Sequence, residues 1–364
     1  MSWYTVTDTD RLDSPALLVY RARVVDNIRR AIAIAGDVDR LRPHVKTHKM
    51  RAVTDLLLAG GVRRFKCATV AEAEMLAEAG APDVLLAYPL VGPKAERLRT
   101  LRAAYPQTAF SALTDQADAA RQLSAVFRAD PLAVYLDLNV GMNRTGVAPA
   151  EAVALYETVR SLPGVRVAGL HAYDGHIRDT DLTDRQHRTD AAYALVQQVQ
   201  AGIRAVGGGE LPVVMGGSPS FPCHAGRSNV EVSPGTFVFW DAGYGEKLPD
   251  LPFEPAALLL TRVISVLDDR TVCLDLGHKA VAAENPLPRV HFLNVADADP
   301  IAQSEEHLVV RVPDAGRHRV GEVWYGLPVH ICPTVALYDS AAVIVDGRVV
   351  ATWPVTARGR QLVV

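Results

Sequence analysis

The residues best suited to chemistry lie in the run Arg42-Pro43-His44-Val45-Lys46-Thr47-His48-Lys49. Pro43 disfavours a helix, so we expect a strand that ends near Lys46 and is followed by a helix over residues 49–58. In barrels and open α/β folds this edge carries the chemistry. If the cations Arg42, His44, His48 and Lys49 surround a partly desolvated Lys46, its amine becomes available for imine chemistry. A solvated basic cluster at a strand end is the alternative interpretation.

The composition excludes several classes of partner. The chain has 364 residues, 49% of them hydrophobic, and a net charge of −3. These values indicate a globular protein with a large core and argue against nucleic acid or an anionic membrane as a partner. No apolar run reaches the length of a spanning helix, and the first residues show no export signal. The four cysteines are far apart, so we expect a cytoplasmic protein without disulfides.

Strands and helices alternate through the first two thirds of the chain. Eight strand–helix units in about 230 residues predict a (β/α)₈ TIM-like barrel over residues 13–245. An open doubly wound sheet is the alternative, but no Gly-x-Gly-x-x-Gly follows the first strand. Residues 246–364, with 1–12, are predicted to form a mostly β domain that includes a hairpin turning at Asp346-Gly347. The predicted barrel strands lie near residues 40–46, 64–67, 83–87, 108–113, 133–138, 166–171, 212–216 and 229–233.

Two predicted strand ends carry groups that could contact a flat cofactor. Arg144 lies in a glycine-containing loop after one strand, from which its guanidinium could hold a phenolate or a carboxylate. On the next strand, His171 and Tyr173 point the same way because strand side chains alternate, and His176 follows. The alternatives are a surface arginine, an aromatic ring packed in the core, and a core histidine whose hydrogen bonds are made within the protein.

Two glycine-containing loops end the last two predicted strands. They are Gly216-Gly217-Ser218 and Pro234-Gly235-Thr236, and Tyr244 follows closely. Converging backbone N–H groups and hydroxyls form phosphate cradles, which barrels often place after strands seven and eight. Four features together indicate a site for pyridoxal phosphate (PLP): a phosphate cradle, a lysine that can form an imine, an arginine that can bind a phenolate, and an aromatic ring.

A possible metal site lies late in the chain, at His330-Ile331-Cys332. On a strand, His330 and Cys332 would face the same side and could hold one metal ion. Nitrogen and sulfur ligands favour Zn²⁺, and two protein ligands leave positions open for water or substrate. Alone, such a pair is more often a coincidence than a metal site.

Five motifs resemble those of one enzyme family. "RPHVKTHK", "GMNRTGV", "GGSPS", "SPGTFVFWDAGY" and "HICPTVALYD" are similar to segments of the D-threonine aldolase and D-serine dehydratase family. These are fold-type III PLP enzymes with an alanine-racemase-like barrel. The resemblance extends from Asp13 to Val355 and implies that Lys46 carries the cofactor. It also implies contacts to the phenolate by Arg144, to the phosphate by Ser218, Gly235, Thr236 and Tyr244, and to a metal by His330 and Cys332.

The motifs depart from the pattern of the family's aldolases in two places. Cys332 stands where bacterial D-threonine aldolases usually have aspartate, as in D-serine dehydratases, although the flanking "PTVALYD" is closer to the aldolases. Family aldolases often have a glutamine just after the second strand, where this chain has Cys67-Ala68-Thr69. The more distant alanine racemases place an arginine where Ser233 stands.

The resemblance implies a PLP-dependent lyase with a divalent metal (Zn²⁺, or Mn²⁺ or Mg²⁺) that acts on D-β-hydroxy-α-amino acids. D-threonine aldolase is the leading expectation, with His171, His176 or a metal-bound hydroxide as the candidate base on the β-hydroxyl. D-serine dehydratase is the alternative, followed by a racemase and a non-catalytic PLP-binding protein. The expected partners are a small-molecule substrate and a second copy of the chain in a homodimer.

Overall fold

The computed structural model describes residues 2–360. The chain divides into two compact units. We call the first the barrel unit; it contains Ala31–Lys46 and Thr54–Gly235. The second, the β unit, contains Thr236–Arg358, Thr47–Val53 and the N-terminal segment up to Arg30. Lys46 and Gly235 are thus each the last residue of a barrel-unit segment.

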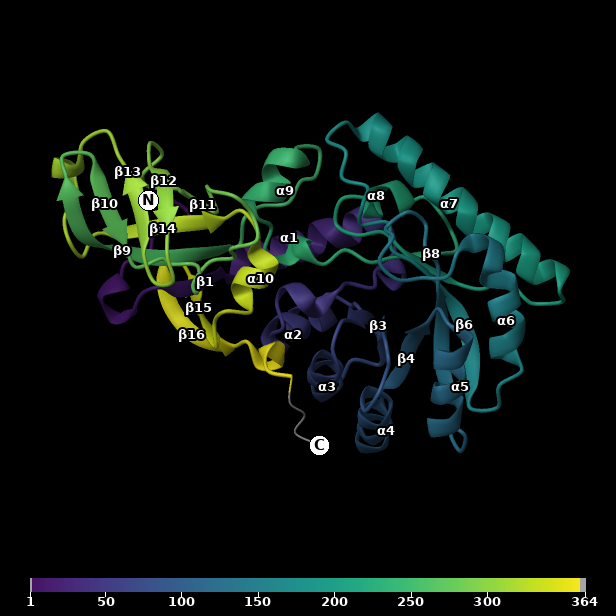
Figure 1. The fold of residues 1–364 in the computed structure, drawn as a ribbon. Helices are drawn as coiled ribbons and strands as arrows, with labels where there is room; N and C mark the ends of the chain where they lie inside the picture. Colours follow the sequence, from purple (N-terminus) through teal and green to yellow (C-terminus); the bar gives the residue numbers. More distant parts are fainter. Residues whose placement is uncertain (1, 361–364) are drawn as a thin grey trace. The chain divides into compact units, whose positions relative to one another are not determined.

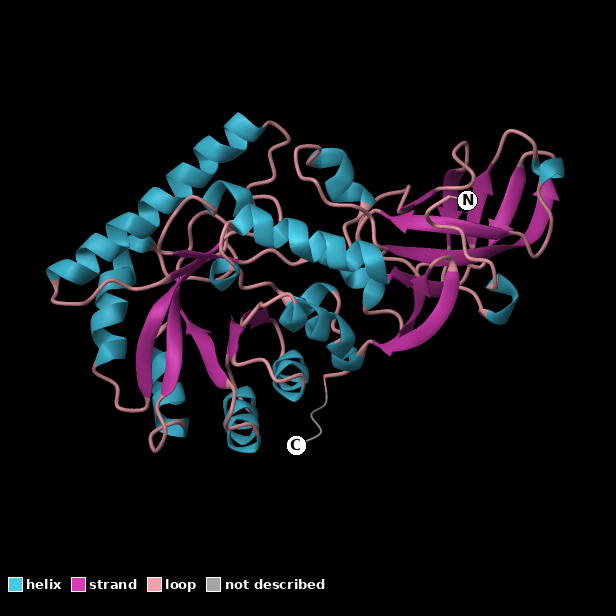
Figure 2. Ribbon diagram, turned by 180° about the vertical axis from the view of Figure 1, so that it is seen from behind, coloured by secondary structure: helices cyan, strands magenta, loops and turns pink. Residues whose placement is uncertain are grey.

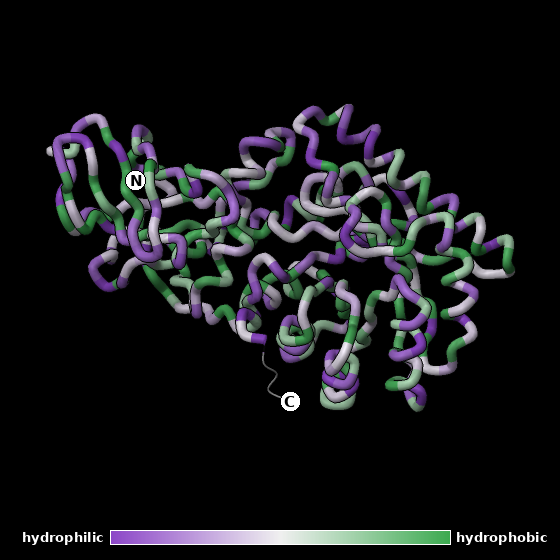
Figure 3. Tube along the Cα trace, viewed as in Figure 1, coloured by the Kyte–Doolittle hydropathy of each residue, from purple (hydrophilic) through white to green (hydrophobic). Residues whose placement is uncertain are grey.

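A curled sheet of seven parallel strands forms the barrel unit, in the order β2-β3-β4-β5-β6-β7-β8. Helices follow the strands and lie on the outer face of the sheet (Figures 1 and 2). Figure 3 shows these helices alternating between hydrophobic and hydrophilic residues, as expected where one helix face packs on a sheet. The elements are β2 (Arg64–Cys67), α3 (Val70–Glu78), β3 (Asp83–Pro89), α4 (Lys94–Ala104), β4 (Ala109–Thr114), α5 (Ala117–Val126), β5 (Leu132–Asp137), α6 (Ala152–Arg160), β6 (Val165–Ala172), α7 (Leu182–Ala205), β7 (Val213–Met215), α8 (Phe221–His224) and β8 (Val230–Val232).

A nine-stranded sheet forms the β unit. Its main path is β12-β13-β10-β9-β1-β15-β16, and β14 pairs with both β9 and β11. Its elements are β1 (Ala16–Tyr20), α9 (Ala242–Lys247), β9 (Ala257–Asp268), β10 (Thr271–Leu274), β11 (Val290–Phe292), β12 (Asp299–Gln303), β13 (Leu308–Arg311), β14 (Val323–Pro328), α10 (Ile331–Val335), β15 (Ser340–Val345) and β16 (Arg348–Pro354). Two further helices, α1 (Arg21–Ala35) and α2 (Arg51–Ala59), each include residues of both units.

Predictions that rest on short sequence patterns are confirmed. The Asp346-Gly347 hairpin joins β15 to β16, and both residues have positive φ, as a type I′ turn requires. Thr69-x-x-Glu72 has the spacing of a capping box, and at the start of α3 the Thr69 hydroxyl accepts from the Glu72 amide, while the Glu72 carboxylate accepts from the amide of Ala68, one residue before the N-cap. None of the helices within residues 2–360 is long and apolar enough to cross a membrane.

The predicted strand over residues 40–46 is wrong as a regular element. Leu41 bridges to Val232 of β8 and His44 bridges to Lys66 of β2, so this segment occupies the position between the two edge strands without a continuous ladder. Pro43 has no N–H to donate, and only its carbonyl takes part, accepting from the Lys66 amide. The other seven predicted barrel strands all form.

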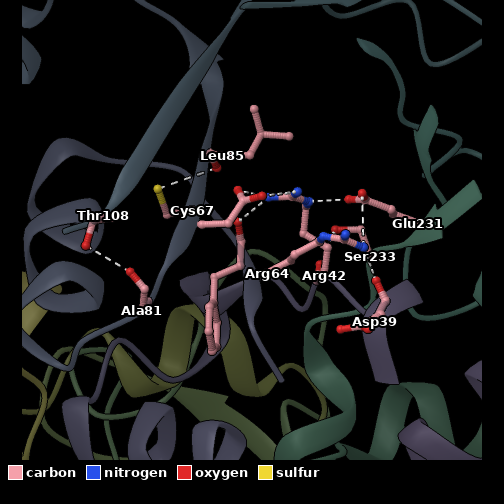
Figure 4. A network of polar contacts seen from close by, with 11 residues as sticks. Asp39, Arg42, Arg64, Cys67, Ala81, Leu85, Thr108, Glu231 and Ser233 are labelled. Atoms are coloured by element: carbon pink, nitrogen blue, oxygen red, sulfur yellow. Dashed lines mark hydrogen bonds and ion pairs between the residues drawn. The ribbon is translucent and has the colours of Figure 1, made fainter. Parts of the chain in front are cut away.

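A buried arginine joins this segment to the edge strand β8 and to the start of β3 (Figure 4). Arg42 is 1% exposed and forms two hydrogen bonds to Asp83, at 2.7 and 3.0 Å. Its Nε donates to Glu231 of β8 at 2.6 Å. The two carboxylates hold the pKa of Arg42 above its usual value despite burial. Arg42 therefore closes the barrel through its charge.

Removing this guanidinium should destabilise the protein. Arg42→Met leaves two carboxylates without their cation, and we expect a loss of about 3 kcal/mol in the free energy of unfolding. Arg64→Met is a matched control, because Arg64 is 38% exposed and meets Glu231 only at 3.5 Å. That change should cost less than about 1 kcal/mol. Chemical unfolding of the two variants checks the prediction, and equal losses would contradict it.

Candidate active site

Lys46 lies in a 3₁₀ turn, Val45–Thr47, that follows the bridged segment. The turn is short because Pro43 precedes it and Lys49 has the positive φ of 52°, which ends the local winding. The Lys46 side chain is half-buried, and its Nζ lies 5.8 Å from the centroid of the Tyr173 ring. Lys46 thus lies at the end of the barrel unit where Tyr173 follows β6.

Two of the cations predicted around Lys46 do not supply the expected positive charge. Arg42 stays charged but forms ion pairs with Asp83 and Glu231, which offset its positive charge. His48 is 1% exposed, and burial lowers its pKa to about 3, so its ring is neutral. The prediction was wrong for both residues because neighbours in sequence need not share an environment in the fold.

Arg144 and Tyr173 come together at a small cavity in the barrel unit. The Arg144 guanidinium carbon lies 5.2 Å from the Tyr173 ring centroid. Both residues line the cavity, together with Asp137, Leu138, Thr145 and His171, among others. His171 and Tyr173 thus line the same cavity from the end of one strand, where an arginine from the neighbouring loop meets them.

His171 is paired with a carboxylate that the sequence analysis did not single out. Its Nδ1 lies 2.7 Å from Asp137 Oδ1, and both side chains are buried. Burial lowers the pKa of His171, so the neutral ring donates from Nδ1 and keeps Nε2 as an acceptor. Burial alone would raise the pKa of Asp137, but the interactions with His171 and Thr145 outweigh it and the net pKa is below its usual range. The pair fixes the orientation of the His171 ring.

Lys66 is a second lysine in the barrel unit that the sequence analysis missed. It is 3% exposed, and its Nζ lies 5.6 Å from the centroid of the Tyr173 ring. Burial is the largest cause that lowers its pKa, to about 7, and the charge of Lys46 acts in the same direction. A lysine between Phe65 and Cys67, inside a strand that is otherwise buried, was the signal that could have revealed it.

The low pKa of Lys66 predicts a pH dependence of stability. Between pH 7 and about 10 the unfolded chain carries a proton on this amine and the folded chain does not. The free energy of unfolding should therefore rise with pH across this window, by about 1.4 kcal/mol per unit from this group alone. Lys66→Met lacks the effect, so the variant's stability advantage over the wild type should shrink from pH 7 to pH 10. Unfolding of both cofactor-free proteins over this range measures it, and a constant difference would contradict the prediction.

The loop after β7 is the first of the two glycine loops that the sequence predicts to form an anion cradle. Gly216 has a positive φ of 84°, and a Cβ on Gly217 would come within 3.1 Å of the Tyr173 ring. The Ser218 hydroxyl accepts from the Gly235 amide at 3.2 Å, which joins the two predicted glycine loops. The backbone needs glycine where it passes the tyrosine ring.

A buried carboxylate, Asp174, supports this cradle. It accepts hydrogen bonds from Ser220 at 2.7 Å and from His224 Nε2 at 2.8 Å. The Ser220 hydroxyl in turn accepts from the Gly217 amide. Burial raises the pKa of Asp174, but its hydrogen bonds outweigh that and keep the net pKa below its usual range. Asp174 is another site residue that sequence reasoning did not select.

His176 has a different environment from His171. Its ring packs against the loop at Gly141, where an added Cβ would come within 2.6 Å of Nε2. Its Nδ1 is buried and has no hydrogen-bond partner among the described residues. His176 does not appear among the residues that line the cavity beside Tyr173.

The remaining predicted site residues lie in the β unit. Cys332 Sγ is 3.2 Å from the Thr47 hydroxyl and 3.4 Å from the Thr236 hydroxyl. Asp241 accepts from the Tyr244 amide and from the Ile331 amide, both at 3.0 Å, and so links α9 to the His-x-Cys segment. Thr236, Tyr244 and Cys332 thus belong to one connected group of residues.

His330 and Cys332 do not lie on a strand, which corrects the expectation from sequence. His330 is the N-cap residue of α10, and Cys332 is in the first turn of that helix. Pro333 follows in the same turn, a position where its missing N–H costs nothing. The two side chains still lie close together, since a hydrogen bond joins them.

The imidazole and the thiol form a polar pair. Burial lowers the pKa of His330, but Cys332 and Glu284 outweigh it and raise it to about 9. Burial raises the pKa of Cys332, but His330 outweighs it and the net pKa is below its usual value. Glu284 lies 2.5 Å from His330 Nδ1. No cluster of three or more His, Cys, Asp or Glu side chains within residues 2–360 is arranged to hold a metal.

Comparison with known proteins places both parts of the chain. The alanine racemase N-terminal domain family matches residues 19–242, and a serine dehydratase domain family matches residues 256–344. A D-threonine aldolase of Arthrobacter sp is 32% identical, with 96% of this chain and 93% of that protein aligned. A 3-hydroxy-D-aspartate aldolase of Paracoccus denitrificans is 30% identical, with 97% and 94% aligned.

A solved structure agrees with this placement. The crystal structure of D-threonine aldolase from Filomicrobium marinum is 30% identical and has a TM-score of 0.88, with 98% of each chain covered. The chain belongs to the alanine-racemase-like family of PLP-dependent enzymes, within the branch of lyases that contains the D-threonine aldolases.

Proposed function

We propose that this protein is a PLP- and divalent-metal-dependent aldolase that cleaves D-threonine to glycine and acetaldehyde. The observation that carries the proposal is the meeting of an amine and a guanidinium, from Lys46 and Arg144, on the single ring of Tyr173. The cavity beside that ring also presents His171. A site with an amine and a fixed cation beside one aromatic ring is suited to bind a flat, anionic aldehyde.

The residues of the barrel unit fit PLP. The glycine backbone at Gly217 leaves the space beside Tyr173 that a Cβ would fill, and Ser218 adds a hydroxyl next to the Gly235 amide. We assign the aldehyde end to Lys46, the phenolate to Arg144, and the phosphate to this cradle with Thr236 and Tyr244. When bound, PLP accepts the electron pair released as a bond at the substrate Cα breaks.

His171 is suited to move a proton. Asp137 accepts its Nδ1 proton, so Nε2 is the free acceptor of a neutral ring. An acceptor of this kind can receive the proton of a substrate β-hydroxyl. His176 stays a second candidate for this role, with its unpartnered Nδ1.

The donor set of the β unit fits one soft divalent cation. A thiol and an imidazole that already contact each other can bind one ion after losing their shared proton, and water or substrate can complete the coordination. The ion would polarise the β-hydroxyl as a Lewis acid. Within the β unit, Cys332 also contacts the hydroxyls of Thr47 and Thr236.

The choice of aldol cleavage has support from the relatives. Two relatives that are 30% or more identical and align over more than nine tenths of both chains are a D-threonine aldolase and a 3-hydroxy-D-aspartate aldolase. A D-threo-3-hydroxyaspartate dehydratase of Delftia sp. is 28% identical, over 62% of its length. Dehydration of D-serine to pyruvate and ammonia is the second candidate, and the cysteine at position 332 favours it because the motif matches the dehydratases there.

Product analysis tests the proposal. The PLP-loaded enzyme is incubated with D-threonine, D-serine and 3-hydroxy-D-aspartate, each with and without a chelator. We expect glycine and acetaldehyde from D-threonine, and loss of both after chelation. Pyruvate from D-serine without glycine from D-threonine would select the dehydratase, and alanine racemisation alone would refute both.

A further inference from the structure

Lys66 projects into the interior of the barrel unit. On β2 it pairs in register with Leu85 of β3, and side chains of paired residues in a parallel sheet point to the same face. Leu85 belongs to the interior core cluster with Leu113, Tyr135 and Val214. The long lysine side chain therefore runs inside the curled sheet, which explains its 3% exposure.

The tip of this side chain reaches the same aromatic ring as Lys46. The two Nζ atoms lie 5.6 and 5.8 Å from the Tyr173 ring centroid, for Lys66 and Lys46 respectively. That ring forms part of the wall of the cavity that contains His171. Two amines of the barrel unit are thus placed near one aromatic ring that lines a cavity.

The surroundings of Lys66 do not fix it as a cation. The charged groups that act on it are Lys46 and Arg42, which disfavour its protonated form, and Asp137 and Asp174, which favour it. These interactions act at longer range. Within residues 2–360, the Lys66 Nζ makes no hydrogen bond or ion pair. With a pKa of about 7, a substantial fraction of the amine is unprotonated near neutral pH, and the unprotonated amine is the nucleophile.

We propose that Lys66 is a second aldehyde-reactive amine of the barrel, placed to take up the aldehyde of PLP when Lys46 is not available. The inference rests on the proposed function, since it requires PLP to bind beside Tyr173. In the reaction the Lys66 nitrogen adds to the aldehyde carbon and a C=N bond replaces the C=O bond. The oxygen leaves as water with the two amine protons, so no oxidant or reductant is needed.

Borohydride trapping locates the amine that holds the cofactor. Each full-length protein is incubated with PLP at pH 7.5, reduced with borohydride, digested and mapped by mass spectrometry. We expect the wild type to carry the pyridoxyl group on Lys46, and Lys46→Ala to carry it on Lys66. The double variant Lys46→Ala/Lys66→Met should carry at least tenfold less pyridoxyl label than Lys46→Ala. Lys46→Ala/Lys94→Met is the matched control, since Lys94 lies on α4 beside Tyr88, and it should keep the label on Lys66.

The outcomes separate this inference from the proposed function. If the wild type is labelled on Lys46 and Lys46→Ala is labelled nowhere, or only on other lysines, the inference fails and the proposed function stands. If the wild type is not labelled on Lys46, the proposed cofactor attachment fails first. Circular dichroism and the thermal midpoint confirm folding of each variant, and Lys46→Gln replaces Lys46→Ala if the alanine variant does not fold.

Discussion

Replacing Lys46 by alanine is expected to lower the turnover of D-threonine by at least about 10³-fold, the scale seen when a covalent catalytic residue is removed. Lys46→Arg should lose activity to a similar extent. Arginine keeps the positive charge beside Tyr173, but its guanidinium stays protonated and cannot bond to an aldehyde carbon. The pair of variants therefore separates the nucleophilic role of the amine from the electrostatic role of a cation.

Glycine formation from D-threonine measures both variants, and Lys94→Ala serves as the control with a lysine removed outside the cavity. If the arginine variant kept more than about a tenth of the wild-type rate, Lys46 would act through its charge, and the assignment of cofactor attachment would have to move to another amine. Lys66 would be the first residue to test.

Replacing Cys332 by alanine is expected to remove the bound metal and to lower activity by on the order of 10²-fold or more, because substitutions even outside the ligand set of a metal commonly cost 10- to 100-fold. The thiol is the softer of the two proposed ligands, and it lies between the Thr47 and Thr236 hydroxyls. Without it, His330 alone cannot hold a cation against exchange with water.

Metal content after dialysis and glycine formation are the two measurements for this variant. Cys273→Ala is the matched control, since Cys273 is a buried free thiol on β10 of the same unit. It should keep both metal and activity. Wild-type turnover in Cys332→Ala, or in the native enzyme after exhaustive chelation, would refute the metal part of the proposal.

Short-range patterns in the sequence were sufficient for much of the fold. The capping box at Thr69 and the Asp346-Gly347 turn depend on hydrogen bonds and backbone angles that residues within a few positions determine. Seven barrel strands could be predicted for the same reason, because a buried parallel strand is a short apolar run between turn signals. The family, too, could be recognised from contiguous motifs.

Only the tertiary structure determined which partners each charged side chain has. Arg42 pairs with Asp83 and Glu231, which lie 41 and 189 residues away in sequence, so its proximity to Lys46 in the chain predicted the wrong role. His330 belongs to the start of a helix and not to a strand, since a three-residue pattern cannot distinguish the two. Lys66, Asp137 and Asp174 became site residues because the register of neighbouring strands and the loop after β6 bring them towards Tyr173 and its cavity. Burial then sets the pKa of each, and burial depends on packing between segments that are distant in the chain.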